Sequence, residues 1–190
     1  MRVMVFAESP ERAGILREGL LLGGYELAEI VTPDVVSVSS LERARPDCLV
    51  LEAPSPDIDL LDRINDAMGA LSRPLVIFAH DASEQAIARA VRAGAASYIV
   101  DGLDATRIPA IMQVALVRFE FLAGLRSELG IARQKLAERK YVERAKGLLM
   151  KSRNLSEDEA YHTLRRMAME RNRRMGDVAR SVIEMAELLD

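Results

Sequence analysis

Short apolar runs alternate with amphipathic segments over the first hundred or so residues of the chain. The runs occupy residues 3–6, 27–31, 48–51, 74–79 and 98–100. Between them, apolar residues recur every three or four positions over 10–22, 57–71 and 84–93, which is the spacing of one helix face. Glycine closes the first and the last of these segments, as it does at helix ends. The pattern therefore predicts strands that alternate with helices.

The predicted strands are uniformly apolar, with no alternation between apolar and polar residues. Such strands are buried on both faces, as in parallel sheets that are covered by helices. Five of them in about a hundred residues indicate an α/β fold with a doubly wound parallel sheet of the flavodoxin-like type, which receiver domains share. No glycine-rich phosphate loop follows the first strand, so a dinucleotide site is not expected.

A long helix is predicted after residue 104, with a heptad seam typical of coiled coils. Its first seam residues, Ile108, Ile111 and Ala115, can pack on the chain's own sheet. The remainder lies too far along the chain for that sheet to cover, so we expect a partner helix in a homodimer. The dimer seam consists of Leu122, Leu125, Leu129, Ala132 and Leu136. A single amphipathic helix packed on its own sheet is the alternative.

Three helical patterns with one apolar stripe each fill the last fifty or so residues, so we expect these helices to pack on one another. Ser156 and Glu159 have the spacing of a capping box that opens the second helix. The third stripe runs from Val178 to Leu189. The predicted organisation is an α/β domain over 1–104, a coiled-coil linker over 105–138 and a three-helix domain over 139–190.

Charge is distributed unevenly, although the whole chain has a net charge of only −3. Residues 1–138 carry 14 Lys/Arg against 20 Asp/Glu, residues 139–175 carry 11 against 5, and residues 176–190 carry 1 against 4. A basic block inside an acidic chain indicates a polyanion as the partner of that block. A solvated helical surface is the alternative.

The basic helices contain residue types that suit RNA. Lys and Arg neutralise phosphates, and a Tyr ring or a guanidinium plane stacks on unpaired bases. Tyr161 and Arg165 lie one helical turn apart, so they can stack together. The candidate RNA-binding residues, expected on the outer helix faces, are Lys146, Met150, Lys151, Arg153, Tyr161, Arg165, Arg166, Arg171, Arg173 and Arg174. The alternative is that Tyr161 packs at the helix edge and the arginines only solubilise the domain.

Composition argues against several other classes of protein. Cys48 is the one cysteine, which excludes an internal disulfide framework and a multi-cysteine zinc site. His80 and His162 lie far apart in the sequence, so no metal site is expected. No apolar run approaches the roughly 18 residues of a membrane span, and the N-terminus does not have the pattern of a signal peptide. We therefore expect a cytoplasmic protein with no cofactor and no membrane partner.

The first half resembles a bacterial response-regulator receiver domain. The resemblance rests on ESPERA after the first strand and on PDCLVLE, PLVIFA and GAASYIV. It implies an acidic pocket in which an Asp accepts a phosphoryl group beside Mg²⁺, a Thr or Ser, and a Lys. This chain has Glu8 as its one acid after the first strand, Glu52 at the acceptor position, Ala79 at the hydroxyl position and Asp101 at the Lys position. We therefore expect a degenerate phosphoacceptor pocket that serves the fold, with weak metal binding by its carboxylates as the alternative.

The last fifty or so residues resemble an ANTAR domain, the RNA-binding module of transcription antiterminators of the AmiR and NasR type. This resemblance rests on AKGLLM at 145–150, LSEDEAY at 155–161, LRRMAM at 164–169 and DVA at 177–179. The longer segments SPERA, VRAGAASYIVDGL and ERAKGLLMKSRNLSEDEAY are similar to the NasT group, which regulates nitrate assimilation.

The resemblance implies a function in binding, not catalysis. Such regulators bind paired hairpins in the leader of a messenger RNA and prevent a terminator hairpin from forming. A sensor protein often holds them inactive, so we expect control by a nitrate- or nitrite-sensing partner of the NasS type in place of phosphorylation. A DNA-binding or phosphorylation-dependent response regulator is the alternative. An enzyme on this scaffold lacks convergent catalytic groups beyond Glu8, Glu52 and Asp101.

Overall fold

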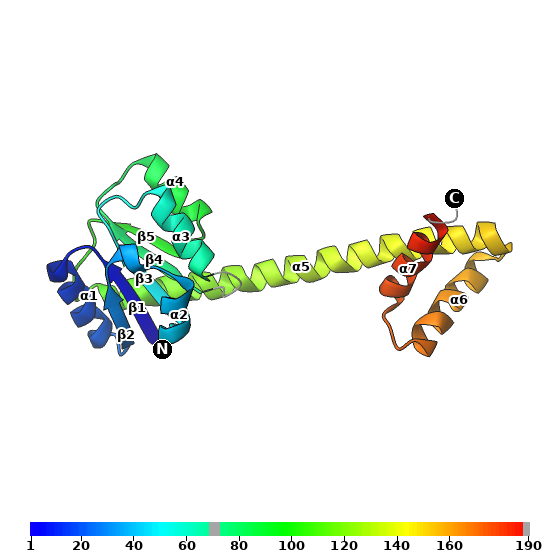
Figure 1. Cartoon of the computed structure of the whole chain (residues 1–190), viewed down its shortest axis with the longest axis horizontal. Coiled ribbons are helices and arrows are strands. Elements are labelled where there is room, and N and C mark those ends of the chain that lie inside the picture. Colours follow the sequence, from blue (N-terminus) through cyan, green and yellow to red (C-terminus); the bar gives the residue numbers. More distant parts are fainter. Residues whose placement is uncertain (69–72, 188–190) are drawn as a thin grey trace. The chain divides into compact units, whose positions relative to one another are not determined.

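The structure is a computed structural model and describes residues 1–68 and 73–187. It contains two compact units, Met1–Leu122 and Ala123–Asp190. The elements in chain order (Figure 1) are β1 (Arg2–Ala7), α1 (Pro10–Leu22), β2 (Glu26–Val31), the 3₁₀ turn η1 (Pro33–Val35), α2 (Val38–Ala44), β3 (Cys48–Glu52), α3 (Ile58–Met68), β4 (Leu75–Ala79), α4 (Glu84–Arg92), β5 (Ser97–Val100), α5 (Ile108–Arg153), α6 (Glu157–Glu170) and α7 (Met175–Glu187). The helix predicted over 57–71 corresponds to α3, and residues 69–71 of that prediction lie outside the described residues.

The five strands form one sheet in the order β2-β1-β3-β4-β5, and every neighbouring pair is parallel. This is the strand order of the flavodoxin-like doubly wound fold, so the predicted fold class is confirmed. In the register of β1 with β3, Ala7 lies opposite Glu52, and in the register of β4 with β5, Ala79 lies opposite Val100. The carboxyl ends of these strands therefore meet at one edge of the sheet.

Successive residues of β1 point to opposite faces of the sheet, and each face has its own core. Met4 and Phe6 belong to a core that α2, α3 and α4 cover. Val3 and Val5 belong to a core that α1 and the first turns of α5 cover. Cys48 lies in this second core and is fully buried, and burial raises the pKa of its thiol to about 12.

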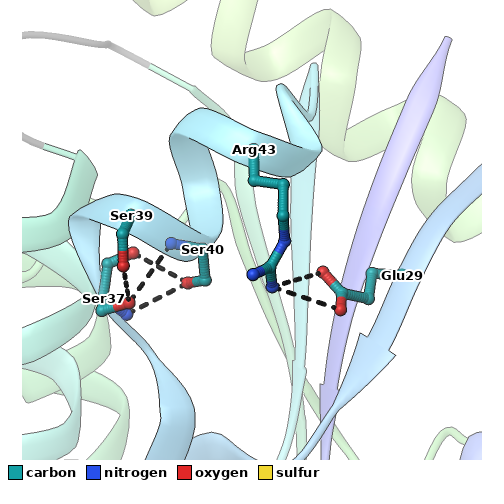
Figure 2. A network of polar contacts seen from close by, with 5 residues as sticks. All are labelled: Glu29, Ser37, Ser39, Ser40 and Arg43. Atoms are coloured by element: carbon teal, nitrogen blue, oxygen red, sulfur yellow. Dashed lines mark hydrogen bonds and ion pairs between the residues drawn. The ribbon is translucent and has the colours of Figure 1, made fainter.

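The short segment η1 and helix α2 are absent from the sequence prediction. Helix α2 begins at a capping box in which the Ser40 backbone N–H donates to Ser37 Oγ and the Ser37 backbone N–H donates to Ser40 Oγ, both at 3.2 Å. Figure 2 shows this serine cluster and the ion pair that joins Arg43 of α2 to Glu29 of β2 at 3.4 Å. Seven residues are too few for a clear apolar period, which is why the helix was missed.

Helix α5 has an apolar face on the sheet and a second apolar face in solvent. Ile108 and Ala115 are fully buried in the core of the first unit, as expected for the first seam residues, whereas Ile111 is partly buried and Met112, which was not in the predicted seam, is fully buried. Leu122, Leu125, Leu129 and Leu136 are 40–57% exposed, and Ala132 is exposed. The exposed face also includes Val114, Val117 and Phe121, which the seam prediction omitted.

By length and composition alone, α5 is apolar enough to cross a membrane, with a mean hydropathy of 1.6 in its most apolar stretch. The expectation that no stretch approaches a span is therefore wrong on composition. Packing explains part of this apolarity, because Ile108, Met112 and Ala115 are covered by the sheet. The helix is also charged along its length, with Arg118 and Glu120 among its early turns.

In the second unit, the last turns of α5 pack with α6 and α7 around one small core. Ala145, Ala160, Leu164 and Ala179 are fully buried in it. The predicted capping box of α6 is confirmed, because Ser156 Oγ accepts from the Glu159 backbone N–H and the Glu159 carboxylate accepts from the Ser156 backbone N–H. Leu189 of the predicted third stripe lies outside the described residues.

We predict that Gly19→Ala destabilises the first unit. A Cβ at Gly19 would lie 2.6 Å from Ile108 Cβ and 2.8 Å from the Ala105 carbonyl oxygen, so α1 would have to move away from the start of α5. We expect a loss of about 1–3 kcal/mol in the free energy of unfolding, as for other overpacked sites, measured by urea denaturation.

Gly14→Ala on the same helix is the matched control. Nothing lies within 4 Å of a Cβ at Gly14, so this variant should gain about 0.5–1 kcal/mol from helix propensity. Equal stability of the two variants would contradict the close approach of α1 to α5.

Candidate nucleic-acid interface and altered receiver pocket

The four residues predicted for the degenerate phosphoacceptor pocket all lie at the carboxyl edge of the sheet. Glu8 follows β1, Glu52 ends β3, Ala79 ends β4 and Asp101 follows β5. The Glu8 backbone N–H donates to Glu52 Oε2 at 3.2 Å. Glu52 is fully buried, whereas Glu8 and Asp101 are exposed. The parallel topology brings the strand ends together, but only one of the three carboxylates is inside the protein.

Arg12 places a positive charge in the pocket. The sequence pattern did not predict this residue there. Its Nε lies 2.5 Å from Glu52 Oε1, and its side chain is 21% exposed. Ser9 caps α1 and accepts from the Arg12 backbone N–H, which fixes this residue in the first turn above the strand ends. A buried carboxylate is stable only beside a cation or hydrogen-bond donors. Arg12 therefore supplies from within the chain the positive charge that a metal ion supplies in the implied receiver pocket.

His80 continues the network from Arg12 to Asp101. Arg12 Nη1 contacts His80 Nε2 and Asp101 Oδ1 contacts His80 Nδ1, both at 2.5 Å. Because a guanidinium can only donate, Nε2 accepts and Nδ1 donates its proton to the carboxylate. Asp101 has a left-handed backbone with φ of 49°. The chain Glu52–Arg12–His80–Asp101 thus joins β3, α1 and the segments after β4 and β5 through one ion pair, in which Arg12 Nε and Glu52 Oε1 make no hydrogen bond, and two side-chain hydrogen bonds.

The altered pocket lacks the groups that hold a phosphoryl ion in the implied receiver mechanism. Ala79 has no hydroxyl, and Asp101 places a carboxylate where that mechanism needs an ammonium. Within residues 1–68 and 73–187, no three His, Cys, Asp or Glu side chains are close enough to hold a metal ion. The alternative of a three-carboxylate metal site therefore has no support in the geometry.

In the second unit, Lys146 lies inside the domain and does not face outward as expected. Its side chain is 9% exposed, and its Nζ lies 2.6 Å from Glu157 Oε1 and 2.9 Å from Glu143 Oε2. The hydrogen bonds that Lys146 donates to Glu157 and Glu143 raise the pKa of Lys146, and the bond donated to Glu157 lowers the pKa of that carboxyl. The prediction that Lys146 is on the outer surface is wrong, because its long side chain turns back and ties α5 to the first turn of α6.

The other nine candidate RNA-binding residues are exposed. Met150 is 37% and Tyr161 is 40% exposed, and the seven remaining residues are exposed basic side chains: Lys151, Arg153, Arg165, Arg166, Arg171, Arg173 and Arg174. Within residues 1–68 and 73–187, none of these seven forms an ion pair. Their charges are therefore available to an external anion.

Two other cations of this unit, Arg144 and Arg180, have internal partners. Arg144 pairs with Glu187 at 2.6 Å, and the Arg180 guanidinium lies 4.8 Å from the centre of the Tyr141 ring. Tyr161 and Arg165 are both exposed, so the prediction that they stack together on an unpaired base stays a prediction. Tyr161 and His162 form a T-shaped pair with ring centres 6.0 Å apart, and Tyr161 is 40% exposed.

Comparison with known proteins agrees with this arrangement of the two units. Residues 132–183 match the model of the ANTAR domain. The transcriptional regulatory protein PdtaR of Mycobacterium tuberculosis is 29% identical over 169 residues, which cover 89% of this chain and 82% of PdtaR. The C-terminal part of the chain is therefore similar to an ANTAR domain. A nitrate regulatory protein of Klebsiella oxytoca is 35% identical over 86 residues, covering 45% of this chain and 21% of that protein.

Solved structures of receiver domains share the fold of the first unit. A two-component response regulator from Clostridium difficile superimposes with a TM-score of 0.52 and 16% identity, covering 62% of this chain and 97% of its own. A CheY-like receiver domain from Methanospirillum hungatei gives a TM-score of 0.51 and 16% identity, covering 63% of this chain and 95% of its own. The first unit thus has the fold of these receiver domains.

The ANTAR match begins inside the segment that we interpreted as a coiled-coil linker. It includes residues 132–138 as well as the last turns of α5, all of α6 and most of α7. The boundaries of the three predicted domains stay predictions.

We predict that Arg12→Met destabilises the first unit, because it leaves the buried Glu52 carboxylate without its cation. Breaking a buried pair typically costs about 3–5 kcal/mol, so we expect a loss of this size in the free energy of unfolding, measured by urea denaturation. The double variant Arg12→Met, Glu52→Gln should recover much of the loss, because the amide oxygen still accepts from the Glu8 backbone.

Arg43→Met is the matched control, because its ion pair with Glu29 is exposed at the surface and such pairs contribute about 0–1 kcal/mol. If Arg12→Met and Arg43→Met were equally stable, the proposed role of Arg12 would have to be abandoned.

We predict that the Lys146 ion pairs make the second unit sensitive to acid. Pairing lowers the pKa of Glu157 below 4.5, so its stabilisation is present above pH 4.5 and is lost as pH falls through the lowered value. Lys146→Met should lower the free energy of unfolding at neutral pH, and its difference from the unsubstituted protein should shrink below pH 4.5. Thermal unfolding followed by circular dichroism at several pH values measures this difference.

Lys151→Met is the control, since this exposed lysine of the same helix has no ion pair in the described residues. A constant difference between Lys146→Met and the unsubstituted protein at all pH values would show that packing, not charge, explains the effect.

Proposed function

We propose that the protein is an RNA-binding transcription antiterminator. In this proposal its C-terminal domain binds paired hairpins in a leader RNA and so prevents a terminator from forming. The observation that carries the proposal is the group of seven exposed basic residues without ion pairs in the described residues of an ANTAR domain. The protein acts by binding, and it needs neither a cofactor nor a catalytic group.

The distribution of cations supports RNA as the ligand. Arg165 and Arg166 project from the middle of α6, while Arg171, Arg173 and Arg174 lie in the turn between α6 and α7. Asn172 has a left-handed backbone with φ of 48°, so this turn is tight and gathers its three arginines in a short segment. A compact set of cations beside an open Tyr161 ring suits phosphates and unpaired bases of an RNA loop.

Dimerisation through α5 suits a target with two hairpins. The exposed leucines of the dimer seam, together with Val114, Val117 and Phe121, form an apolar face without cover in the described residues. A second copy of the helix is the occupant we propose, because the seam has heptad spacing. Two RNA-binding domains in one dimer make the second hairpin contact intramolecular, which raises the overall affinity.

We further propose that a sensor protein, not phosphorylation, controls the regulator in the cytoplasm. Two features support this: Arg12 already neutralises Glu52, and Asp101 would repel an incoming phosphoryl group. Nitrate or nitrite assimilation is the regulated pathway in this proposal. Its support is the similarity to the nitrate regulatory protein of Klebsiella oxytoca, and a nitrate- or nitrite-sensing partner of the NasS type is the expected sensor.

We predict that replacing Arg165 and Arg166 with Ala weakens RNA binding without unfolding the domain. The probe is a synthetic transcript with two adjacent hairpins, and anisotropy titrations of the full chain over a range of salt concentrations give the affinity. Loss of two phosphate contacts should lower the slope of log affinity against log salt by about 1–2. Lys146→Met should leave this slope unchanged while the protein is folded, because its ammonium is paired internally.

The control variant replaces Arg17 and Arg92, two exposed arginines of the first unit, and should bind RNA normally. Unchanged affinity and salt slope in the Arg165, Arg166 variant would refute the proposed surface. Preference for duplex DNA of the same length over the hairpins would instead favour a DNA-binding response regulator.

A further inference from the structure

A hollow opens where the three helices of the second unit meet, and it shares Tyr161 with the candidate RNA-binding residues. Its volume is about 350 Å³, within the range of about 300–1,000 Å³ that is typical of small-ligand pockets. Lys135, Arg139 and Val142 line it from one face of α5. Tyr161 contributes from α6, and Met175 and Gly176 contribute from the start of α7. Figure 1 shows α6 and α7 beside the C-terminal part of α5.

Gly176 brings α7 close to α5. A Cβ at this position would lie 2.8 Å from Glu138 Cγ and 3.2 Å from Glu138 Cβ, so a larger residue would require the Glu138 side chain to move. Val142 is 8% exposed and Met175 is half-buried. These two side chains give the hollow an apolar part of its lining.

The rim of the hollow carries an open aromatic ring and two cations. Tyr161 is 40% exposed, and Lys135 and Arg139 are exposed and form no ion pair within residues 1–68 and 73–187. Two carboxylates also line it, and each already accepts a hydrogen bond or ion pair: Glu138 from Gln134 at 3.0 Å and Glu143 from Lys146 at 2.9 Å. Lys135 and Arg139 are thus the cations at the rim that an incoming phosphate can reach, while Glu138, whose hydrogen-bond donor is a neutral amide, keeps its negative charge.

We propose that this hollow is a subsite for one unpaired nucleobase of the RNA, with its ring against Tyr161 and its phosphate on Lys135 and Arg139. The proposal rests on the proposed function and adds three residues to the RNA contact, Lys135, Arg139 and Met175. Stacking needs a flat apolar slot with one aromatic wall, and a phosphate needs cations about one nucleotide away. Duplex RNA does not fit this slot, because its bases are already stacked, so the subsite selects a looped or extruded base.

The first test is photo-crosslinking of the full chain. The probe is the two-hairpin transcript with 4-thiouridine or 6-thioguanosine at one loop position at a time. We expect at least one loop position to crosslink to Tyr161 or Met175, identified by mass spectrometry of the peptides. Crosslinks confined to the turn that contains Arg171, Arg173 and Arg174 would overturn the subsite and leave the proposed function intact. Failure of the protein to bind the transcript at all would overturn both.

The second test separates stacking from packing. Tyr161→Leu should weaken binding about tenfold, whereas Tyr161→Phe, which retains an aromatic ring, should bind within about twofold of the original protein. Lys135→Gln with Arg139→Gln should also weaken binding about tenfold, with an unchanged circular dichroism spectrum. Lys140→Gln is the matched control on the same helix, outside the hollow. Equal affinity of Tyr161→Leu and Tyr161→Phe would exclude the stacking role.

Discussion

A carboxylate that is buried away from water needs a positive charge beside it. This requirement determines the side-chain contacts at the carboxyl edge of the sheet. Glu52 is fully buried at the end of β3, and Arg12 comes from the first turn of α1 to meet it. The same guanidinium extends the contact to His80, which reaches Asp101. In a pocket built for phosphoryl transfer, such charges stay available to a metal ion and a phosphate. Here Arg12 neutralises Glu52 and contacts His80, so these charges are already engaged by other groups of the protein.

In the second unit, one basic residue is paired with carboxylates of the protein, and others have no such partner in the described residues. Lys146 is held by Glu143 and Glu157 and stabilises the contact of α5 with α6, whereas Arg165 and Arg166 on the next helix have no such carboxylates in the described residues. Residues of one chemical type therefore divide into a structural set and a set that is available to a ligand. Burial and the identity of the neighbours make this division, and the count of basic residues does not reveal it.

The sequence predicted the strands well because their apolar runs are long and uniform, and the parallel order of the sheet followed from the alternation of strands with helices. Helix α2 was not predicted because its seven residues are too few to show an apolar period. The main sequence feature of this helix is the pair of serines that forms its capping box. Arg12 was missed because its partner Glu52 is distant in the sequence, and no local pattern marks a pair that only the fold brings together. Lys146 was misplaced because helical spacing gives the direction in which a side chain leaves the backbone, not where its flexible end binds.

The buried thiol of Cys48 gives the chain a practical chemical property. Its pKa of about 12 keeps it protonated, and the second core shields it from reagents, whereas alkylation and oxidation proceed through an accessible thiolate. If a second cysteine is introduced on a helix surface, a maleimide dye will therefore modify that cysteine and not Cys48. A single fluorophore can thus be attached to either unit without first replacing Cys48.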